Sequence, residues 1–176
     1  MTESDGELIL EVTARSVGLS QTVKEEGGRR EKLPEIKMKD DSCIFCKLAN
    51  GEIPTRKIYE DEMFSVIMDS SPASRGHSLI LPKEHYADIY EITEDTAAKA
   101  MALAKRLAEK MTASLGCDGF NILQNNGETA GQTVFHFHIH LIPRYKGKDN
   151  MILWSHQEFG DEEMDALCVQ LSDACR

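Results

Sequence analysis

The segment that decides the fold is a run of alternating histidine and apolar residues, which reads His136-Phe137-His138-Ile139-His140-Leu141-Ile142. Successive side chains of a β-strand point to opposite faces of a sheet. The run therefore predicts a strand over residues 134–142, stopped by Pro143, with three imidazoles on one face and an apolar core stripe on the other. Three neighbouring imidazoles need hydrogen-bond partners, a metal or solvent. Clustered ionisable groups favour a functional site over a face that is merely rich in histidine.

Further strands are predicted on the N-terminal side of this run. Residues 57–60 and 63–68 form a hairpin around an acidic turn. A short apolar run over 78–81 is stopped by Pro82, which is typical of a buried strand, and residues 120–124 form another. Together with the predicted helices, these strands indicate an α+β domain with a mostly antiparallel sheet.

Three helices are predicted as well. A short one covers residues 43–50 and ends at Gly51. The longest begins after the N-cap Thr93, has carboxylates in its first turn, and ends at Gly116. Its predicted buried face recurs at three-four spacing and consists of Ala97, Met101, Ala104, Ala108, Met111 and Leu115. The C-terminal part has a second amphipathic pattern, formed by Met164, Leu167, Cys168 and Leu171.

The chain has 176 residues, which suits one domain with a substantial core. Residues 1–40 are charged and broken by glycine in their second half, so we expect a flexible N-terminal extension. Residues 41–148 form the predicted domain. Residues 149–176 form a C-terminal segment that carries the amphipathic helix.

Composition excludes several classes of partner. The net charge of -10 disfavours binding to nucleic acid, although backbone amides can still hold a small anion. No apolar run approaches the roughly twenty residues of a membrane-spanning helix. The five cysteines are odd in number and are not spaced like a secreted disulfide framework. We therefore expect a cytoplasmic protein without a membrane partner.

The segment 136–142 matches, at every position, the signature of the histidine-triad (HIT) family, and the chain resembles that family over about 42–144. The supporting segments are 69–72, 76–83, 125–127 and 131–133, in the family's order and spacing. Transferase and phosphorylase relatives carry glutamine at the third position, so His140 resembles the hydrolases. The resemblance implies a five-stranded, mostly antiparallel sheet with one long helix and short helices, and a homodimer that joins two such sheets. The opening Cys43 to Pro54 is similar to small bacterial members near the Hint branch.

The resemblance also implies roles for individual residues. His138 would attack the α-phosphorus of a nucleotide and form a covalent nucleotidyl-histidine, which water then hydrolyses. His140 would bind a phosphate oxygen or assist the leaving group, and His77 would support the triad. The ribose hydroxyls would bind to Asp69. The implied phosphate contacts are Asn125, Gln132 and Thr133, and the implied apolar clamp around the base is Ile44, Phe45, Leu48, Ile53 and Ile67.

Structural interpretations compete with some of these roles. Asp69 precedes a serine-rich turn and is also a natural turn cap. The segment 125–127 reads equally well as a plain turn. The five clamp residues, taken on sequence alone, are more often ordinary core.

Cys43 and Cys46 have the spacing of two thiolates on one metal, and such a site needs two more ligands. A redox pair is a weaker interpretation, because no βαβ context surrounds the motif, and two unpaired thiols are the plainest one. The resemblance to zinc-bearing bacterial relatives implies that His85 and His136 complete a structural Cys₂His₂ zinc site.

The function implied by the resemblance is hydrolysis of purine nucleoside phosphoramidates or related nucleotides. One alternative is a dinucleoside polyphosphate hydrolase. The other is a nucleotide-binding or interaction protein that keeps the pocket without important turnover.

Overall fold

The computed structural model describes residues 39–148 and 156–176. The predicted N-terminal extension over 1–40 lies outside the described residues, apart from its last two positions. Within the described part of the chain, no helix combines the length and the apolar character needed to cross a membrane.

The domain contains one five-stranded sheet in which every neighbouring pair of strands is antiparallel. The strand order is β1-β2-β3-β5-β4, so β1 and β4 are the edges. The strands are β1 (Lys57–Glu60), β2 (Phe64–Met68), β3 (Ser78–Pro82), β4 (Gly119–Leu123) and β5 (Ile139–Arg144). The predicted α+β class with a five-stranded antiparallel sheet is therefore confirmed.

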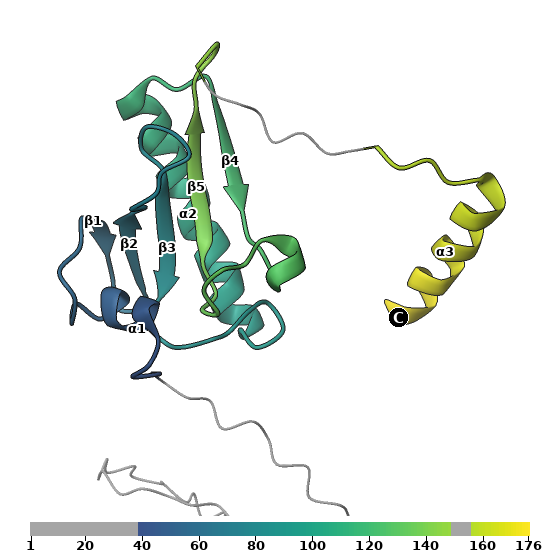
Figure 1. Cartoon of the computed structure of the whole chain (residues 1–176), viewed down its shortest axis with the longest axis horizontal. Coiled ribbons are helices and arrows are strands. Elements are labelled where there is room, and N and C mark those ends of the chain that lie inside the picture. Colours follow the sequence, from purple (N-terminus) through teal and green to yellow (C-terminus); the bar gives the residue numbers. More distant parts are fainter. Residues whose placement is uncertain (1–38, 149–155) are drawn as a thin grey trace, which may run out of the picture. The chain divides into compact units, whose positions relative to one another are not determined.

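Helices cover both faces of this sheet (Figure 1). On one face the long helix α2 (Glu94–Leu115) packs on the main core, which includes Val66, Ile80 and Leu103. On the other face the short helix α1 (Ile44–Ala49) packs on a smaller cluster that includes Ile67 and Leu79. Because β2 and β3 are buried on both faces, their burial is continuous rather than alternating.

The ends of α2 form as the sequence predicts. The Thr93 hydroxyl accepts the backbone N–H of Thr96, and Gly116 ends the helix at φ 62°, a left-handed conformation that glycine adopts without strain. The predicted buried face was partly wrong, because Met101 is 52% exposed. The buried residues of α2 are Thr96, Ala100, Leu103, Ala104 and Leu107. Of the predicted residues, Ala104 is buried and Ala97 and Met111 pack against the main core, whereas the buried Leu103 and Leu107 were not predicted.

The predicted strand over 134–142 was also partly wrong. β5 begins at Ile139 and continues through Pro143, so His136 and His138 lie in the segment that enters the strand. The alternation of faces nevertheless holds, since Phe137, Ile139 and Leu141 all belong to the main core. Pro143 is tolerated because β5 pairs with β3 only from Ile139 to Leu141, and beyond that point only with β4.

The C-terminal segment contains the predicted helix, α3 (Asp161–Ala174). Three acidic residues occupy its first turn, where their negative charges interact favourably with the positive end of the helix dipole and stabilise the helix. None of its residues is buried, including the predicted apolar positions Met164, Leu167 and Leu171.

Candidate active site and metal cluster

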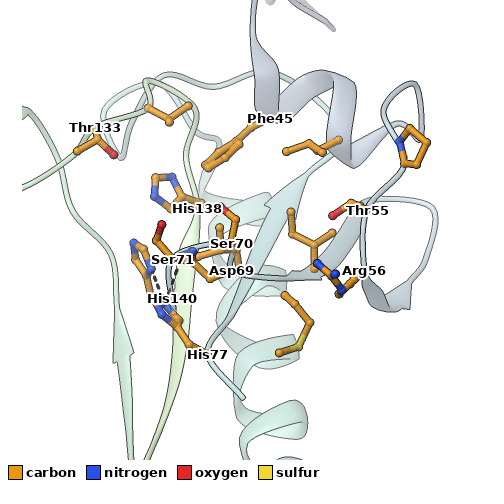
Figure 2. A pocket seen from close by; sticks show the side chains of 16 residues that line it. Phe45, Thr55, Arg56, Asp69, Ser70, Ser71, His77, Thr133, His138 and His140 are labelled. Carbon is orange, nitrogen blue, oxygen red and sulfur yellow. Dashed lines mark hydrogen bonds and ion pairs between the residues drawn. The ribbon is translucent and has the colours of Figure 1, made fainter. Parts of the chain in front are cut away.

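A cavity of about 970 Å³ opens on the face of the sheet that carries α1. It is bounded by α1, by the residues before β1, by the end of β2 and the turn after it, and by the histidine segment (Figure 2). Eight of the predicted site residues line it, and they are Phe45, Leu48, Ile67, Asp69, His77, Thr133, His138 and His140. The fold therefore gathers residues from four separate stretches of sequence into one cavity.

His138 is held by a single short hydrogen bond. Its Nδ1 lies 2.6 Å from the backbone oxygen of His136, and a carbonyl oxygen can only accept, so Nδ1 carries the proton. In the neutral ring the lone pair is then on Nε2. The ring is 5% exposed, lines the cavity, and packs edge-on against Phe45 with the ring centroids 5.1 Å apart. Burial lowers its pKa below the ordinary value of 6.5, which keeps the ring neutral at pH 7.

A second chain of hydrogen bonds orients His140. The backbone N–H of Ala73 donates to Nδ1 of His77 over 3.0 Å, so a neutral His77 carries its proton on Nε2. That nitrogen lies 3.0 Å from Nδ1 of His140 and donates to it. His140 therefore carries its own proton on Nε2. The backbone amide of Ala73 thus determines, through the rings of His77 and His140, which nitrogen of His140 is a donor.

The imidazole rings of His77 and His140 are both neutral at pH 7. Burial, with smaller contributions from His138 and His77, lowers the pKa of His140 to about 4. Burial also lowers the pKa of His77, against an opposing contribution from Asp69. His140 is consequently a neutral N–H donor in the resting protein rather than an imidazolium.

The same hydrogen bonds decide how to interpret the grouping of Asp69, His77 and His140. One ligand-type atom from each lies within 4.8 Å of the others, as in a two-histidine, one-carboxylate metal site. A metal would need the lone pair of His77 Nε2, but the Ala73 N–H places a proton on that nitrogen. The group is therefore better described as a proton-bearing chain with a nearby carboxylate, whose Oδ2 lies 3.5 Å from His77 Nε2.

Asp69 also caps the turn that follows β2. Its Oδ1 accepts the backbone N–H of Ser71 over 2.7 Å, as the turn-cap interpretation expects. A carboxylate has more acceptor capacity than this one bond uses. The cap therefore fixes the side chain at the cavity wall and does not conflict with a contact to ribose.

Four predicted nucleotide contacts do not line the cavity: Ile44, Ile53, Asn125 and Gln132. Ile44 is 45% exposed, because α1 turns Phe45 and Leu48 inward instead. The Gln132 amide is buried and fully engaged: its oxygen accepts from Gly127 N–H, and its nitrogen donates to the carbonyls of Ala87 and Val134. It braces the loop before the histidine segment. The predicted contacts of these four residues with the nucleotide stay predictions.

The cavity also contains residues that the sequence did not single out. They are Pro54, Thr55, Arg56, Met68, Ser70, Ser71, Leu79 and Val134. Ser70 and Ser71 directly follow Asp69 in the segment 69–72, which resembles the family, so their position next to Asp69 could have identified them as cavity residues. Thr55 and Arg56 follow a proline turn and carry no pattern, and only the pairing of β1 with β2 places them beside the cavity.

Beside the cavity, four side chains form a compact cluster: Cys43, Cys46, His85 and His136. Their ligand-type atoms all lie within 4.8 Å of one another. Nδ1 of His136 lies 3.5 Å from both sulfurs, and Nδ1 of His85 lies 3.3 Å from the Cys46 sulfur. The two sulfurs come from one turn of helix, since Cys43 is the N-cap of α1 and Cys46 lies three residues on. The predicted metal-ligand set is thus brought together.

The chemistry of the cluster fits a metal ion. Nε2 of His136 donates to the backbone oxygen of Pro82 over 3.0 Å, which leaves the Nδ1 lone pair directed at the sulfurs. Burial lowers the pKa of His136 to about 4, so the ring is in its ligating, neutral form. Burial, assisted by Cys43, raises the pKa of the Cys46 thiol to about 11. A bound cation would displace this proton and stabilise the thiolate.

The fold and the site define a class of protein: an α+β domain with a buried row of histidines beside a cavity lined by apolar and hydroxyl side chains. The family model of the HIT domain matches residues 50–147. The chain belongs to the HIT family.

Named relatives extend this result. The chain is 40% identical to the adenosine 5'-monophosphoramidase HNT1 of Saccharomyces cerevisiae, over 75% of this chain and 82% of the relative. It is 43% identical to the adenylylsulfatase HINT3 of Arabidopsis thaliana, over 65% of this chain and 57% of the relative. The crystal structure of a zinc-bound histidine triad family protein from Mycobacterium smegmatis superposes with a TM-score of 0.59 at 38% identity, covering 76% of this chain and 97% of the other.

Proposed function

We propose that this protein hydrolyses purine nucleoside phosphoramidates, or related nucleotides, at the α-phosphate through a covalent intermediate on His138. The observation that carries the proposal is the 2.6 Å bond from His138 Nδ1 to the His136 carbonyl, which leaves the Nε2 lone pair of a cavity-lining ring unprotonated. A neutral, oriented imidazole nitrogen is a nucleophile at pH 7. The relatives named as a monophosphoramidase and an adenylylsulfatase support the same reaction class.

In the first step, Nε2 of His138 forms a bond to the α-phosphorus while the bond from phosphorus to the leaving nitrogen breaks. The leaving nitrogen keeps the electron pair of the broken bond and takes up one further proton from water at the open cavity, so it departs as the neutral amine. The N–H of His140 Nε2 donates to a phosphate oxygen, where negative charge accumulates. His77 keeps that donor in place through its own bond to His140 Nδ1.

In the second step, a water oxygen bonds to phosphorus and the bond from phosphorus to His138 Nε2 breaks. The protons of that water pass to solvent and to the mononucleotide, and His138 returns to its neutral form with Nδ1–H. The bond to the His136 carbonyl is compatible with both stages, because Nδ1 remains a donor throughout.

The remaining cavity residues suit a nucleoside. Phe45 and Leu48 on α1 pack against the small cluster that contains Ile67 on β2, and these three cavity-lining side chains offer apolar surface for a base. Asp69 Oδ2 is available to accept from the ribose hydroxyls, and the Thr133 hydroxyl is available to a phosphate oxygen.

We also propose that the cluster of two cysteines and two histidines binds zinc. Two thiolates and two imidazoles are a common structural zinc set, and four protein ligands leave no open position for catalysis. The ion, when bound, supplies a cross-link between α1 and the histidine segment. The side chain of His136 would ligate the ion. The backbone oxygen of the same residue accepts the hydrogen bond from His138 Nδ1. The zinc-bound relative supports this assignment.

A cytoplasmic homodimer completes the proposal. None of the five cysteines forms a disulfide, as expected in a reducing compartment. Joining two sheets requires an edge strand. The register of β1 against β2 shifts between Lys57 and Tyr59. Such an irregularity makes an edge strand less suitable for pairing with a strand of another molecule. The regular edge strand β4 is therefore the better candidate to pair with its copy.

A substrate comparison tests the proposed function. We expect adenosine 5'-phosphoramidate to be hydrolysed to the mononucleotide with a kcat/KM at least about tenfold above that for a diadenosine polyphosphate, because a small amine leaves the cavity with little steric demand. Chromatography of the products gives both rates. A reversed preference would select the polyphosphate hydrolase, and tight nucleotide binding without turnover of either compound would select the binding protein.

The pH profile offers an independent prediction. His138 must be neutral to attack, and burial lowers its pKa below 6.5. The rate is therefore expected to fall to half its plateau value only at a pH below 6.5, as the folded protein takes up protons. Steady-state kcat/KM on the phosphoramidate, with matched ionic strength and a stability check at each pH, measures the acid limb. A half-maximal rate near pH 6.5 or above would contradict the orientation proposed for His138.

A further inference from the structure

We infer that Arg56 reads the edge of the base and gives the site a preference for guanine over adenine nucleotides. This inference rests on the proposed nucleotide hydrolase and concerns the end of the cavity opposite the histidines.

Arg56 lies at the far end of the cavity from the reacting groups. In Figure 2, Thr55 and Arg56 are on one side, His138 and Thr133 are on the other, and Asp69 and Ser70 lie between them. The sheet order explains the separation. Arg56 immediately precedes β1, which is three strand positions from β5, or about 14 Å at the usual spacing of neighbouring strands. With the phosphorus at His138 and the ribose at Asp69, the base extends towards Arg56.

The backbone at Arg56 is fixed while its side chain remains available. Its carbonyl accepts the N–H of Met68 over 2.8 Å, which ties the residue to the end of β2 beside Asp69. Within residues 39–148 and 156–176, no carboxylate forms an ion pair with its guanidinium and no hydrogen bond engages it. By contrast, the next cation in sequence, Lys57, is paired with Glu60. Arg56 is therefore the cation at this end that is free to meet a ligand.

The chemistry of the guanidinium favours one purine. Its N–H groups form a planar fork with no acceptor, and this fork matches the two acceptors O6 and N7 of guanine. Adenine presents a donor, its N6 amino group, where guanine has O6, so the fork meets a donor there. The apolar walls formed by Phe45, Leu48 and Ile67 hold either purine equally. Discrimination between the purines thus falls to the polar group at the base edge.

The test measures kcat/KM for guanosine and adenosine 5'-phosphoramidates with four proteins: wild type, Arg56→Ala, Arg56→Gln and the control Lys57→Ala. The wild type is expected to prefer guanosine by about five- to tenfold, the low end for a bidentate arginine–guanine pair. Arg56→Ala brings the ratio close to one, and Arg56→Gln moves it towards adenosine, because glutamine pairs with N6 and N7 of adenine. Lys57→Ala removes one positive charge next to Arg56 and leaves the ratio unchanged.

Two outcomes would overturn the inference while leaving the hydrolase intact. One is a guanosine-to-adenosine ratio that Arg56→Ala does not change. The other is an equal loss for both substrates in Arg56→Ala, which would indicate a general electrostatic or stacking contact. If the wild type hydrolyses neither substrate, the proposed function fails, and calorimetric titration with the two nucleoside monophosphates still decides the role of Arg56. A guanine preference in binding that disappears in Arg56→Ala supports the base contact, and its absence refutes it.

Discussion

Replacing His138 with alanine is expected to lower kcat for an adenosine phosphoramidate by more than about 10⁴-fold, because losing a covalent nucleophile removes the whole two-step route. Neither of the other two histidines that line the cavity can substitute for it. His140 presents an N–H rather than a lone pair on Nε2, and Nε2 of His77 is used to hold His140. The assay is steady-state release of the mononucleotide.

Two controls separate chemistry from folding. His156→Ala changes an exposed histidine outside the cavity and should leave kcat unaltered. The His138→Ala protein should keep its far-ultraviolet circular dichroism spectrum and bind the mononucleotide, since Phe45, Leu48 and Asp69 remain. Rapid quenching of the wild type with substrate labelled at the α-phosphate should trap label on the protein, and the variant should trap none. Equal trapping on both proteins would remove His138 from the proposed role.

Replacing Cys46 with serine is expected to lower the melting temperature by about 10 °C or more and to abolish stoichiometric zinc. Cys46 is fully buried and its sulfur lies within 3.5 Å of Nδ1 of both His85 and His136, so a serine would leave the other ligands without a complete site. The binding energy of a structural zinc contributes to folding. A loss of about 3 kcal/mol corresponds to this shift for a domain of about this size.

Cys168→Ser is the matched control, because it makes the same chemical change at an exposed position on α3. That protein should keep about one zinc per chain, as one complete four-ligand site requires, and the wild-type melting temperature. Elemental analysis of both proteins, expressed with zinc supplied, gives the metal content, and scanning calorimetry gives the midpoints. Wild-type protein without zinc, or a Cys46→Ser protein that melts with the control, would contradict the proposed site.

Loss of zinc should also disturb the positions of Phe45 and His138 in the candidate active site. The proposed ion would join α1 to the histidine segment, and α1 carries Phe45, whose ring packs on His138 with the centroids 5.1 Å apart. The backbone oxygen that orients His138 belongs to His136, itself a proposed ligand. The proposed metal cluster and the proposed nucleophile are therefore neighbours on one short segment of chain, and we expect the first and second histidines of the motif to have different roles.

Local patterns predicted the elements that depend on local interactions. The cap at Thr93 and the stop at Gly116 set the ends of α2, because each depends on a hydrogen bond or a conformation within one turn. The spacing of Cys43 and Cys46 on one helical turn, and the alternation of faces from Phe137 to Leu141, are likewise local consequences of chain geometry. The wrong details, such as the exposed Met101 and the late start of β5, concern which of several similar patterns the core and the neighbouring strands select.

The sequence by itself predicted the family and the α+β class, and through the family resemblance it indicated a candidate nucleophile and four candidate metal ligands, since these depend on residue identity and spacing. Only the tertiary structure decided three other properties. The Ala73 amide sets the proton positions on His77 and His140, the Gln132 amide is used to brace a loop, and Arg56 faces the far end of the cavity. Each of these properties depends on at least one contact between segments that are distant along the chain, such as that of His77 with His140 or that of Gln132 with Ala87, and the local sequence does not predict such contacts.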